Sequence, residues 1–490
     1  MRKRVSFAIR VVLFSLIACF VITIVNYVIT PKKYFEDLWP TTSTYKGFYK
    51  MDKDTVDVIF LGSSHAAAAF NPQVIYDKYG ITSYNLACEQ QNLVVSYYWL
   101  KETLRYQKPS AVVVETNMLY TFDPTEPLNT SESFTRMAMD AMKWSDVKWE
   151  AIHDICRLDP KQTVNSYIFR NVRFHNRWME LSENDFEFLS LENHYELKGF
   201  SALSKRGDST PDYEPILISN YEAYAEPEPV MVNYLDKIVE LCKDNEINLV
   251  LTKTPSTGWD ENRHNAVQEY ASENGVEFCD FNEYIAYTDS EFNWAKDMND
   301  DWHTNIWGAK RVSKYIAKLL QEDYGVEGAV YDHQWADTRE YYEQVVEDCK
   351  IANIKDIDEY LEKIDKPRYT VLVAAKNDMS FCVTDAVKKA FSKMGFKLPS
   401  KEYDGYCAVK NEEDVNEDAG MEPLHFVGSV RDKIVDYSVT SKGYYAGSDC
   451  SIKIDDVEYA KKWDGINIVV YCNDTRKVID SVVYDGGMNR

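Results

Sequence analysis

VDVIFLGSSHAAAAF, residues 56–70, is an apolar run that ends abruptly at Gly62, Ser63, Ser64 and His65 and continues into four alanines. A short apolar run bounded by turn residues is typical of a buried parallel strand. The bend that follows such a strand lies at the carboxyl edge of the sheet, where open α/β sheets carry their sites. Because alanines let the next helix approach closely, its first N–H groups can stabilise an oxyanion there.

The same alternation continues along the chain. Short apolar runs at 56–62, 83–87, 110–116, 247–256 and 276–282 predict strands, and the segments at 71–80, 94–107, 234–245, 263–275 and 304–325 predict helices. Strands that alternate with helices favour an α/β fold with a central parallel sheet. We therefore expect one α/β domain over residues 35–335. Residues 124–230 are polar, aromatic and helix-like, and we interpret them as a helical insertion.

The texture changes after this domain. Residues 336–366 are highly charged with a helical pattern, which predicts a connecting linker. From Tyr369 onward, β-rich pieces are separated by turn residues. We expect residues 367–490 to form a small β-rich module, either α+β or a β-sandwich.

The first 34 residues differ from the rest. Val11 to Ile29 is a 19-residue run interrupted only by Ser15, Thr23 and Asn26. At about 1.5 Å per residue, such a helix matches the hydrocarbon thickness of a bilayer. Basic residues are more numerous before this run than after it, where Lys32 and Lys33 follow. This asymmetry predicts a cytoplasmic N-terminus. We expect a single-pass anchor in the cell membrane with the bulk of the chain extracytoplasmic; a long signal peptide is the alternative.

Composition limits the classes of partner. The 490 residues include 55 Lys and Arg against 79 Asp and Glu, a net charge of −24, which disfavours binding to nucleic acid. The 35 Tyr and 11 Trp suit surfaces that stack on sugar rings, although cores use the same residues. The ten cysteines show no metal-type spacing, so we expect no metal or other cofactor, while disulfide pairing stays open.

A serine becomes a nucleophile only beside a base that a third group orients. The segment DMNDDWHTNIWGAKRV, residues 297–312, supplies Asp300 and His303, which share a face at this spacing. We predict that Ser64 is the nucleophile, His303 the base and Asp300 its orienting acid, with Asp297 the second choice of acid.

Other residues of the same edge have less specific interpretations. We interpret Ser63 as the small residue that the bend needs, and His65 as a helix cap or a substrate contact. Lys253 ends a predicted strand at this edge, so we include it as a candidate substrate contact.

These motifs resemble the SGNH (GDSL-type) hydrolase superfamily over residues 50–325, in its membrane-anchored branch of DltD-like and AlgX-like proteins. FLGSSH resembles the family's Gly-x-Ser block, which implies the nucleophile role for Ser64, and DMNDDWHTNIWGA resembles its Asp-x-x-His block. The resemblance implies a three-layer fold. It also makes Gly62, Gln91 and Asn117 candidate oxyanion or substrate residues. YNLACEQQNLVVSYYWLKE, residues 84–102, resembles the family's second block, and VVVETN, residues 112–117, resembles its third. The oxyanion-donating glycine of the second block has no clear counterpart, because Glu89 or Gln90 stands there.

The C-terminal module resembles the ILEI/PANDER-type domain, most specifically at the strand Gly465–Val470. The usual closing Phe-Asp-Thr is here Tyr484-Asp485-Gly486. The resemblance implies carbohydrate binding, and a spacer or dimerisation module is the alternative.

Together these features predict a membrane-anchored serine esterase or O-acyltransferase that acts on acyl groups, acetyl first, of a surface glycan or cell-wall polymer. A membrane-bound O-acyltransferase is the expected protein partner. The alternative is a catalytically degenerate scaffold that binds glycan or assists such an acyltransferase.

Overall fold

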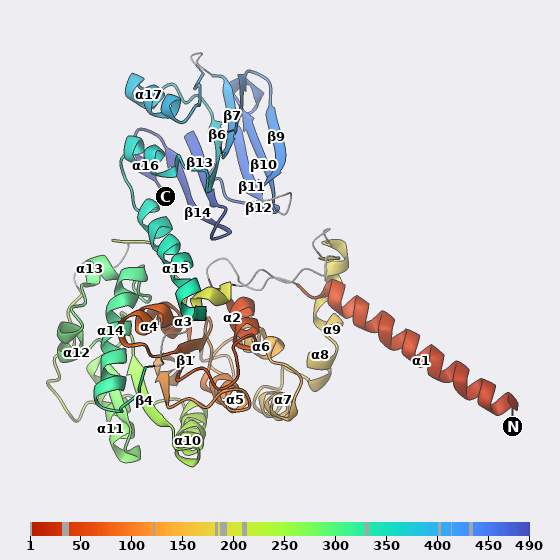
Figure 1. Cartoon of the computed structure of the whole chain (residues 1–490), viewed down its shortest axis with the longest axis vertical. Helices are drawn as coiled ribbons and strands as arrows, with labels where there is room; N and C mark the ends of the chain where they lie inside the picture. The colour runs from red at the N-terminus through yellow and green to blue at the C-terminus, as the bar shows by residue number, and fades with distance from the viewer. Residues whose placement is uncertain are drawn as a thin grey trace. The chain divides into compact units, whose positions relative to one another are not determined.

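The computed structural model describes residues 2–490 except 32–38, 121–122, 182–184, 187–193, 208–212, 329–332, 400–402, 413 and 431–434. The chain forms two compact units (Figure 1). The first comprises Met1–Leu203 and Gly207–Trp335, and the second comprises Ser204–Arg206 and Ala336–Arg490.

The first unit is built on a five-stranded parallel sheet in the order β2-β1-β3-β4-β5. Its strands are β1 (Val58–Gly62), β2 (Ser83–Ala87), β3 (Ala111–Glu115), β4 (Asn248–Lys253) and β5 (Glu277–Asp280). The predicted α/β class with a central parallel sheet is confirmed. Since the chain goes to opposite sides of β1 to form β2 and β3, the order changes direction between β1 and β3. Open α/β sheets bind their ligands at such a point.

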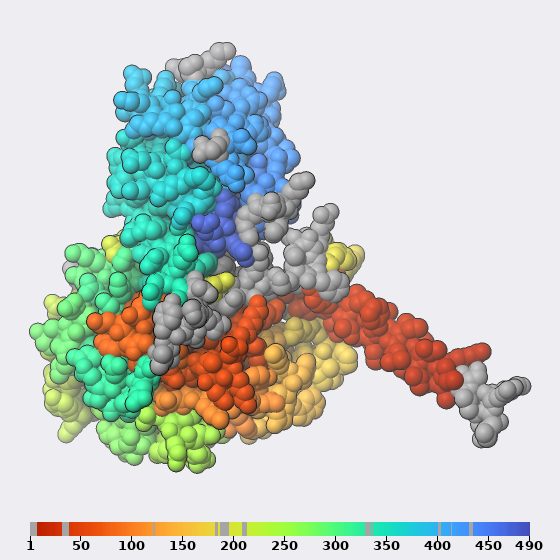
Figure 2. All heavy atoms as spheres, in the orientation of Figure 1, coloured from red at the N-terminus to blue at the C-terminus, as the bar shows by residue number. Residues whose placement is uncertain are grey.

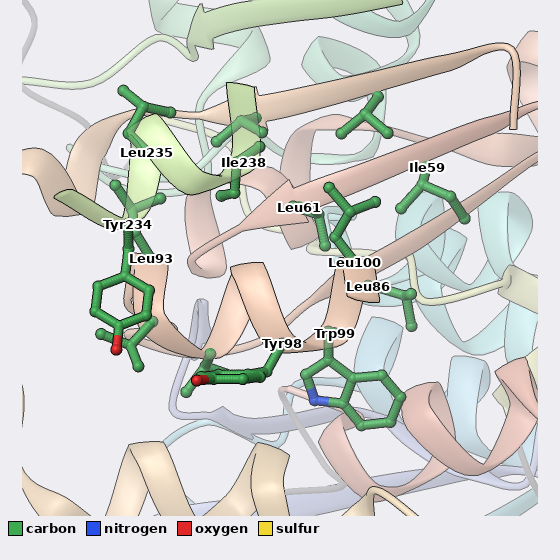
Figure 3. Packing of buried hydrophobic residues seen from close by; sticks show 14 of the residues in the cluster. Ile59, Leu61, Leu86, Leu93, Tyr98, Trp99, Leu100, Tyr234, Leu235 and Ile238 are labelled. Atoms are coloured by element: carbon green, nitrogen blue, oxygen red, sulfur yellow. The ribbon is translucent and has the colours of Figure 1, made fainter. Parts of the chain in front are cut away.

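Helices cover both faces of this sheet, which gives the expected three layers. The helices are α2 (Thr41–Phe48), α3 (Ser64–Ala69), α4 (Pro72–Tyr79), α5 (Leu93–Thr103), α10 (Pro229–Asp244), α11 (Glu261–Asn274), α12 (Tyr284–Asp289), α13 (Trp294–Asp297) and α14 (Ile306–Glu322). Ile59 and Leu61 of β1 pack into one core with α5 and α10 (Figure 3). Val58 and Phe60 pack into the other core with α3, α4 and α14. Helices α4 and α14 lie side by side at the surface (Figure 2).

The segment interpreted as an insertion holds short helices and no named strand among its described residues. They are α6 (Glu132–Ala141), α7 (Asp146–Leu158), α8 (Val164–Ile168), α9 (Asn171–Phe174) and the 3-10 turns η2 (His175–Met179) and η4 (His194–Leu197). Met139 of α6 and Ile152 of α7 are buried in the core that α5 and α10 share. The insertion is therefore part of the packed first unit.

The N-terminal helix α1 (Arg2–Ile29) is long and apolar enough to span a membrane over Phe7–Ile29. None of its most apolar window is buried against the protein. Lys32 and Lys33, which entered the topology prediction, lie outside the described residues. The helix is thus consistent with an anchor, and its orientation stays a prediction.

The second unit contains two antiparallel sheets, in the orders β15-β14-β13-β6-β7-β8 and β12-β11-β10-β9. Their strands are β6 (Tyr369–Lys376), β7 (Gly405–Asn411), β8 (Asp414–Gly420), β9 (Leu424–Val430), β10 (Val435–Lys442), β11 (Asp449–Ile454), β12 (Val457–Glu458), β13 (Gly465–Cys472), β14 (Lys477–Tyr484) and β15 (Met488–Asn489). One core lies between the sheets, and a second lies between the larger sheet and the helices. The C-terminal β-rich region is therefore a sandwich with helices on one face.

The segment expected as a linker lies within this second unit. It forms most of α15 (His333–Ile351) and all of α16 (Ile357–Ile364), and α17 (Asp385–Lys393) follows β6. Tyr360 and Leu361 of α16 are buried in the helix-side core. The helical pattern of 336–366 therefore belongs to an amphipathic cover of the sheet, because its apolar residues are spaced for one face.

Candidate active site

The turn after β1 requires glycine at residue 62. Gly62 has φ of +152°, and a Cβ atom there would lie 2.7 Å from the Cβ of Glu115 and 3.0 Å from the Cβ of Ala66. Any larger residue would separate β3 and α3 from the end of β1. Gly62 therefore serves the close packing that brings Ser64 to the sheet edge.

Ser63 and Ser64 have different roles at the start of α3. The Ser63 Oγ accepts a hydrogen bond from the N–H of His65, as an N-cap residue does, and donates one to Glu115 Oε2 at 3.2 Å. Ser64 is the first helical residue. Its N–H is one of the orphan donors of a helix start, and no described residue accepts from it.

The loop that carries the base is fixed against α3. Met298 and Thr304 form an antiparallel bridge, and the N–H of Asn299 donates to the carbonyl of His303 at 2.8 Å. The Thr304 hydroxyl donates to the carbonyl of Ala68 at 2.8 Å. The loop therefore cannot shift without breaking contacts to the helix that begins at Ser64.

Ser64, His303 and Asp300 form a continuous hydrogen-bonded chain. The Ser64 Oγ lies 2.9 Å from His303 Nε2, although 239 positions separate the two residues. His303 Nδ1 lies 3.0 Å and 3.1 Å from the two carboxylate oxygens of Asp300. Since a carboxylate accepts, Nδ1 carries the proton and Nε2 is free to accept from the serine. The predicted nucleophile, base and acid thus lie in the relation that serine activation requires.

Asp300 is held in its charged form. Burial by itself raises the pKa of this carboxyl group, but the hydrogen bond and charge of His303 and the donors of Trp302 and Asn299 outweigh burial. The net effect lowers the pKa of Asp300 from 3.8 to about 2. Asp300 therefore stays ionised at neutral pH and can stabilise an imidazolium at residue 303.

Two candidate oxyanion donors lie at the ends of β1 and β3. One is the N–H of Ser64, and the other is the side-chain amide of Asn117, which makes no hydrogen bond to any described residue. Gln90, in the expected second-block position, has φ of +49°, a conformation that favours glycine. The loop therefore has a glycine-like backbone without the glycine.

Gln91 and Asp297 serve the protein interior. The Gln91 side chain donates to Leu86 O and Ser96 Oγ, both at 3.0 Å, and accepts from the Tyr45 hydroxyl. Asp297 accepts from Arg311 Nε and from the N–H of Asn293, both at 2.8 Å. Neither side chain is placed to serve the role predicted for it, because both are committed to structural contacts.

Lys253 is wholly buried and does not offer its charge to substrate. Its Nζ lies 3.3 Å from Glu115 Oε1 and 3.2 Å from His65 Nδ1, and the side chain of Lys253 is 0% exposed. His65 is likewise not the cap of α3, because Ser63 has that role.

Sequence reasoning missed Glu115 and Trp39. Trp39 is buried, and its ring lies 4.9 Å from that of His303, centroid to centroid. The sequence could have indicated Glu115, because it ends an otherwise apolar strand and a charge in such a position needs a buried partner. Trp39 offered no signal, because only tertiary packing brings it to His303. Among the described residues, no group of three or more His, Cys, Asp or Glu side chains could hold a metal ion.

No family model matches the chain. No curated protein matches it either. Comparison with solved structures found a G-D-S-L family protein from Desulfitobacterium hafniense at 12% identity and a TM-score of 0.26, covering 54% of this chain and 98% of that one. A GDSL-like lipase from Bacteroides thetaiotaomicron matches at 12% identity and a TM-score of 0.26, covering 58% of this chain and 99% of that one. An active-site mutant of a family two carbohydrate esterase from Clostridium thermocellum matches at 10% identity and a TM-score of 0.25, covering 56% of this chain and 66% of that one. Likenesses at these TM-scores neither establish a family nor assign a substrate.

Proposed function

We propose that the protein is a membrane-anchored serine esterase or O-acyltransferase that acts on acyl groups, acetyl first, of a surface glycan or cell-wall polymer. The observation that carries the proposal is the hydrogen-bonded chain from Ser64 through His303 to Asp300. A serine hydroxyl that donates to an imidazole, itself oriented by an ionised carboxylate, is the arrangement that activates an alcohol as a nucleophile.

In the first half-reaction Ser64 Oγ attacks the ester carbonyl while His303 Nε2 takes its proton. The carbonyl oxygen becomes an oxyanion, for which the Ser64 N–H and the Asn117 amide are the available donors. The tetrahedral intermediate collapses with cleavage of the bond to the alcohol oxygen, and His303 returns the proton to that oxygen. An acyl group remains on Ser64.

In the second half-reaction an acceptor hydroxyl oxygen attacks the carbonyl of the acyl-enzyme while His303 takes its proton. The bond to Ser64 Oγ then breaks, His303 returns the proton to Ser64 Oγ, and the acyl group leaves on the acceptor. Water as the acceptor makes the protein an esterase, whereas a sugar hydroxyl makes it an acyltransferase. A membrane-bound O-acyltransferase that supplies the acyl group is the partner we propose for the second case, and the apolar helix Phe7–Ile29 supports an arrangement at the membrane.

The experiment compares p-nitrophenyl acetate hydrolysis by the full chain and by Ser64→Ala in the same detergent. We expect the variant to lose at least about 10³-fold in kcat, because removal of the nucleophile disables the triad as a unit. Ser392→Ala, at an exposed position of α17, is the matched control and should keep full turnover. Equal turnover by wild type and Ser64→Ala contradicts the proposal. Wild type without turnover favours the scaffold alternative or a transferase that lacks its acceptor.

We also propose that the second unit binds carbohydrate. Three tyrosine rings gather there: Tyr403 lies 5.1 Å from Tyr444 and 5.6 Å from Tyr445 by ring centroids. Tyr444 and Tyr445 are 51% and 66% exposed. Exposed aromatic rings with a polar hydroxyl suit the apolar faces of sugar rings.

A further inference from the structure

A buried ion pair joins the ends of β3 and β4, and its glutamate is hydrogen-bonded to Ser63, the residue before the predicted nucleophile. Glu115 at the end of β3 and Lys253 at the end of β4 are 3.3 Å apart, and both side chains are 0% exposed. Glu115 also accepts from the Ser63 hydroxyl and from the N–H of Asn117, each at 3.2 Å. A fully buried charge pair is costly unless its remaining hydrogen bonds are satisfied, so this pair is well partnered but gives little net stability.

Lys253 determines which nitrogen of His65 carries a proton. The ammonium has three donors, and they point to Glu115 Oε1, to the carbonyl of Thr254 at 3.0 Å and to His65 Nδ1 at 3.2 Å. A nitrogen that accepts from an ammonium is unprotonated, so the neutral His65 ring carries its hydrogen on Nε2. Burial, with the charges of Lys253 and His303, lowers the pKa of His65 well below its ordinary value. His65 is therefore a donor of fixed tautomer.

This donor has no partner in the described part of the chain, yet it lies beside the site. The only side-chain hydrogen bond of His65 among the described residues is the one to Lys253, and the residue keeps 8% of its surface exposed. Its Nε2 is not among the fully buried polar atoms that lack a partner. The ring lies 5.2 Å from that of His303, centroid to centroid. Two imidazoles thus lie side by side next to Ser64.

His303 hands its proton to the alcohol oxygen that leaves, so that oxygen lies within hydrogen-bond distance of His303. Oxygens on adjacent carbons of a sugar ring are near enough to one another for neighbouring imidazoles to contact one each. We propose that His65 Nε2–H binds the hydroxyl adjacent to the acylated oxygen, and that Lys253 is the positioning residue that fixes this tautomer. This rests on the proposed esterase or acyltransferase function, and it narrows the substrate class to monoesters of vicinal diols, as in an acylated sugar.

The test measures a preference with the full chain in detergent. Its substrates are a monoacetylated pyranoside with a free neighbouring hydroxyl and the deoxy analogue in which hydrogen replaces that hydroxyl. Wild type is expected to favour the hydroxyl substrate about tenfold in kcat/KM, the size of one good hydrogen bond. His65→Gln places an amide donor near the Nε2 position and should keep the preference. His65→Asn, which places it near the Nδ1 position, should lose it.

Lys253 is tested in the charge-matched variant Lys253→Met with Glu115→Gln, which leaves no unpaired buried charge. We expect it to lose the preference as well, which a purely structural role would not cause, since misfolding lowers turnover of both substrates alike. If this variant does not fold, the Gln and Asn variants at residue 65 decide. Wild type without a preference, or His65→Asn with an unchanged one, overturns the inference.

Failure of the proposed function has a different signature. If Ser64→Ala turns over the acetylated pyranoside as wild type does, the esterase mechanism itself is wrong, and the inference is overturned with it. If Ser64→Ala is inactive while wild type shows no preference, only the role of His65 is wrong.

Discussion

The carboxylate of Asp300 accepts from the imidazole of His303 and also from the backbone N–H groups of Trp302 and His303, at 2.8 Å and 2.9 Å. The acid of the candidate triad is therefore bonded to the backbone of the same loop as the base that it orients. Because the Asp300 side chain both orients His303 and holds the backbone of the loop, a substitution at residue 300 should affect both catalysis and stability.

For activity, we expect Asp300→Asn to lower kcat by about 10³–10⁴-fold. The amide of Asn can donate to Nδ1 of His303, and the imidazole hydrogen then lies on Nε2. A protonated Nε2 can no longer accept a hydrogen bond from Ser64. Turnover of p-nitrophenyl acetate measures the loss. Asp244→Asn, at an exposed position of α10, is the control. Activity of Asp300→Asn near that of wild type would contradict the orienting role.

The direction of the pH effect on stability follows from the low pKa of Asp300, which is about 2 in the folded chain and 3.8 for a free side chain. A depressed folded value means that the charge stabilises the fold above about pH 4, and that this contribution is lost as pH falls through about 2. The difference in Tm between wild type and Asp300→Asn should therefore be larger at pH 7 than at pH 2.5. An equal difference at both values would contradict the assigned cause.

At the scale of elements, α6 and α7 meet around a buried lysine. Lys148 of α7 is 1% exposed, and its Nζ donates to the carbonyl of Met142 at 2.6 Å and to that of Asp140 at 3.4 Å. Burial lowers the pKa of Lys148 to about 7; Asp140 opposes this effect, and two nearby arginines add to it. The lysine thus closes the end of α6 while its charge is poorly solvated.

This position predicts a pH-dependent stability. Since the folded pKa of Lys148 is below the unfolded value, the unfolded chain binds more protons between about pH 7 and 10, and wild type gains stability as pH rises through that range. Lys148→Met lacks the gain, so its Tm relative to wild type should fall between pH 6 and pH 9.5. Lys108→Met, at an 80% exposed side chain, is the control. A relative Tm that rises with pH would contradict the assignment.

At the scale of the whole molecule, the chain combines an apolar helix with two compact units. We expect the full chain to stay with membranes after an alkaline carbonate wash, and Leu16→Arg with Phe20→Arg to be released, because each arginine in the span costs about 3 kcal/mol. Leu16→Val with Phe20→Leu is the matched control. Retention of the arginine variant would contradict the anchor.

The second unit carries its own prediction. Tyr444→Ala with Tyr445→Ala should weaken binding of the full chain to glycans on a printed array by about tenfold, because it removes two exposed stacking surfaces. Tyr221→Ala, in the first unit and 82% exposed, is the control. Array binding that both variants leave unchanged, or lose alike, would contradict a sugar platform at these tyrosines.

Short-range sequence patterns were enough to predict the local features of this protein. Alternating strands and helices indicated the α/β sheet, the Gly-Ser-Ser bend indicated a site after β1, and the Asp-x-x-His spacing indicated that Asp300 and His303 share a turn. Each of these follows from short-range rules, since strand burial, turn geometry and spacing on one turn depend on neighbouring residues. The first 30 residues were readable for the same reason.

Which distant residues meet depends on how the strands pair and the loops pack in the folded chain. Lys253 was predicted to end a strand and to be a candidate substrate contact. Because β3 pairs with β4 so that Glu115 lies opposite Thr252, Lys253 instead forms a buried ion pair with Glu115, 138 positions away. Gln91 read as a substrate residue and bonds to the core, and 336–366 read as a linker and covers a sheet. Periodicity shows that a side chain is buried, but its partners depend on which strands pair and which loops the fold brings together. That is why the role inferred for His65 could be argued only from the folded chain.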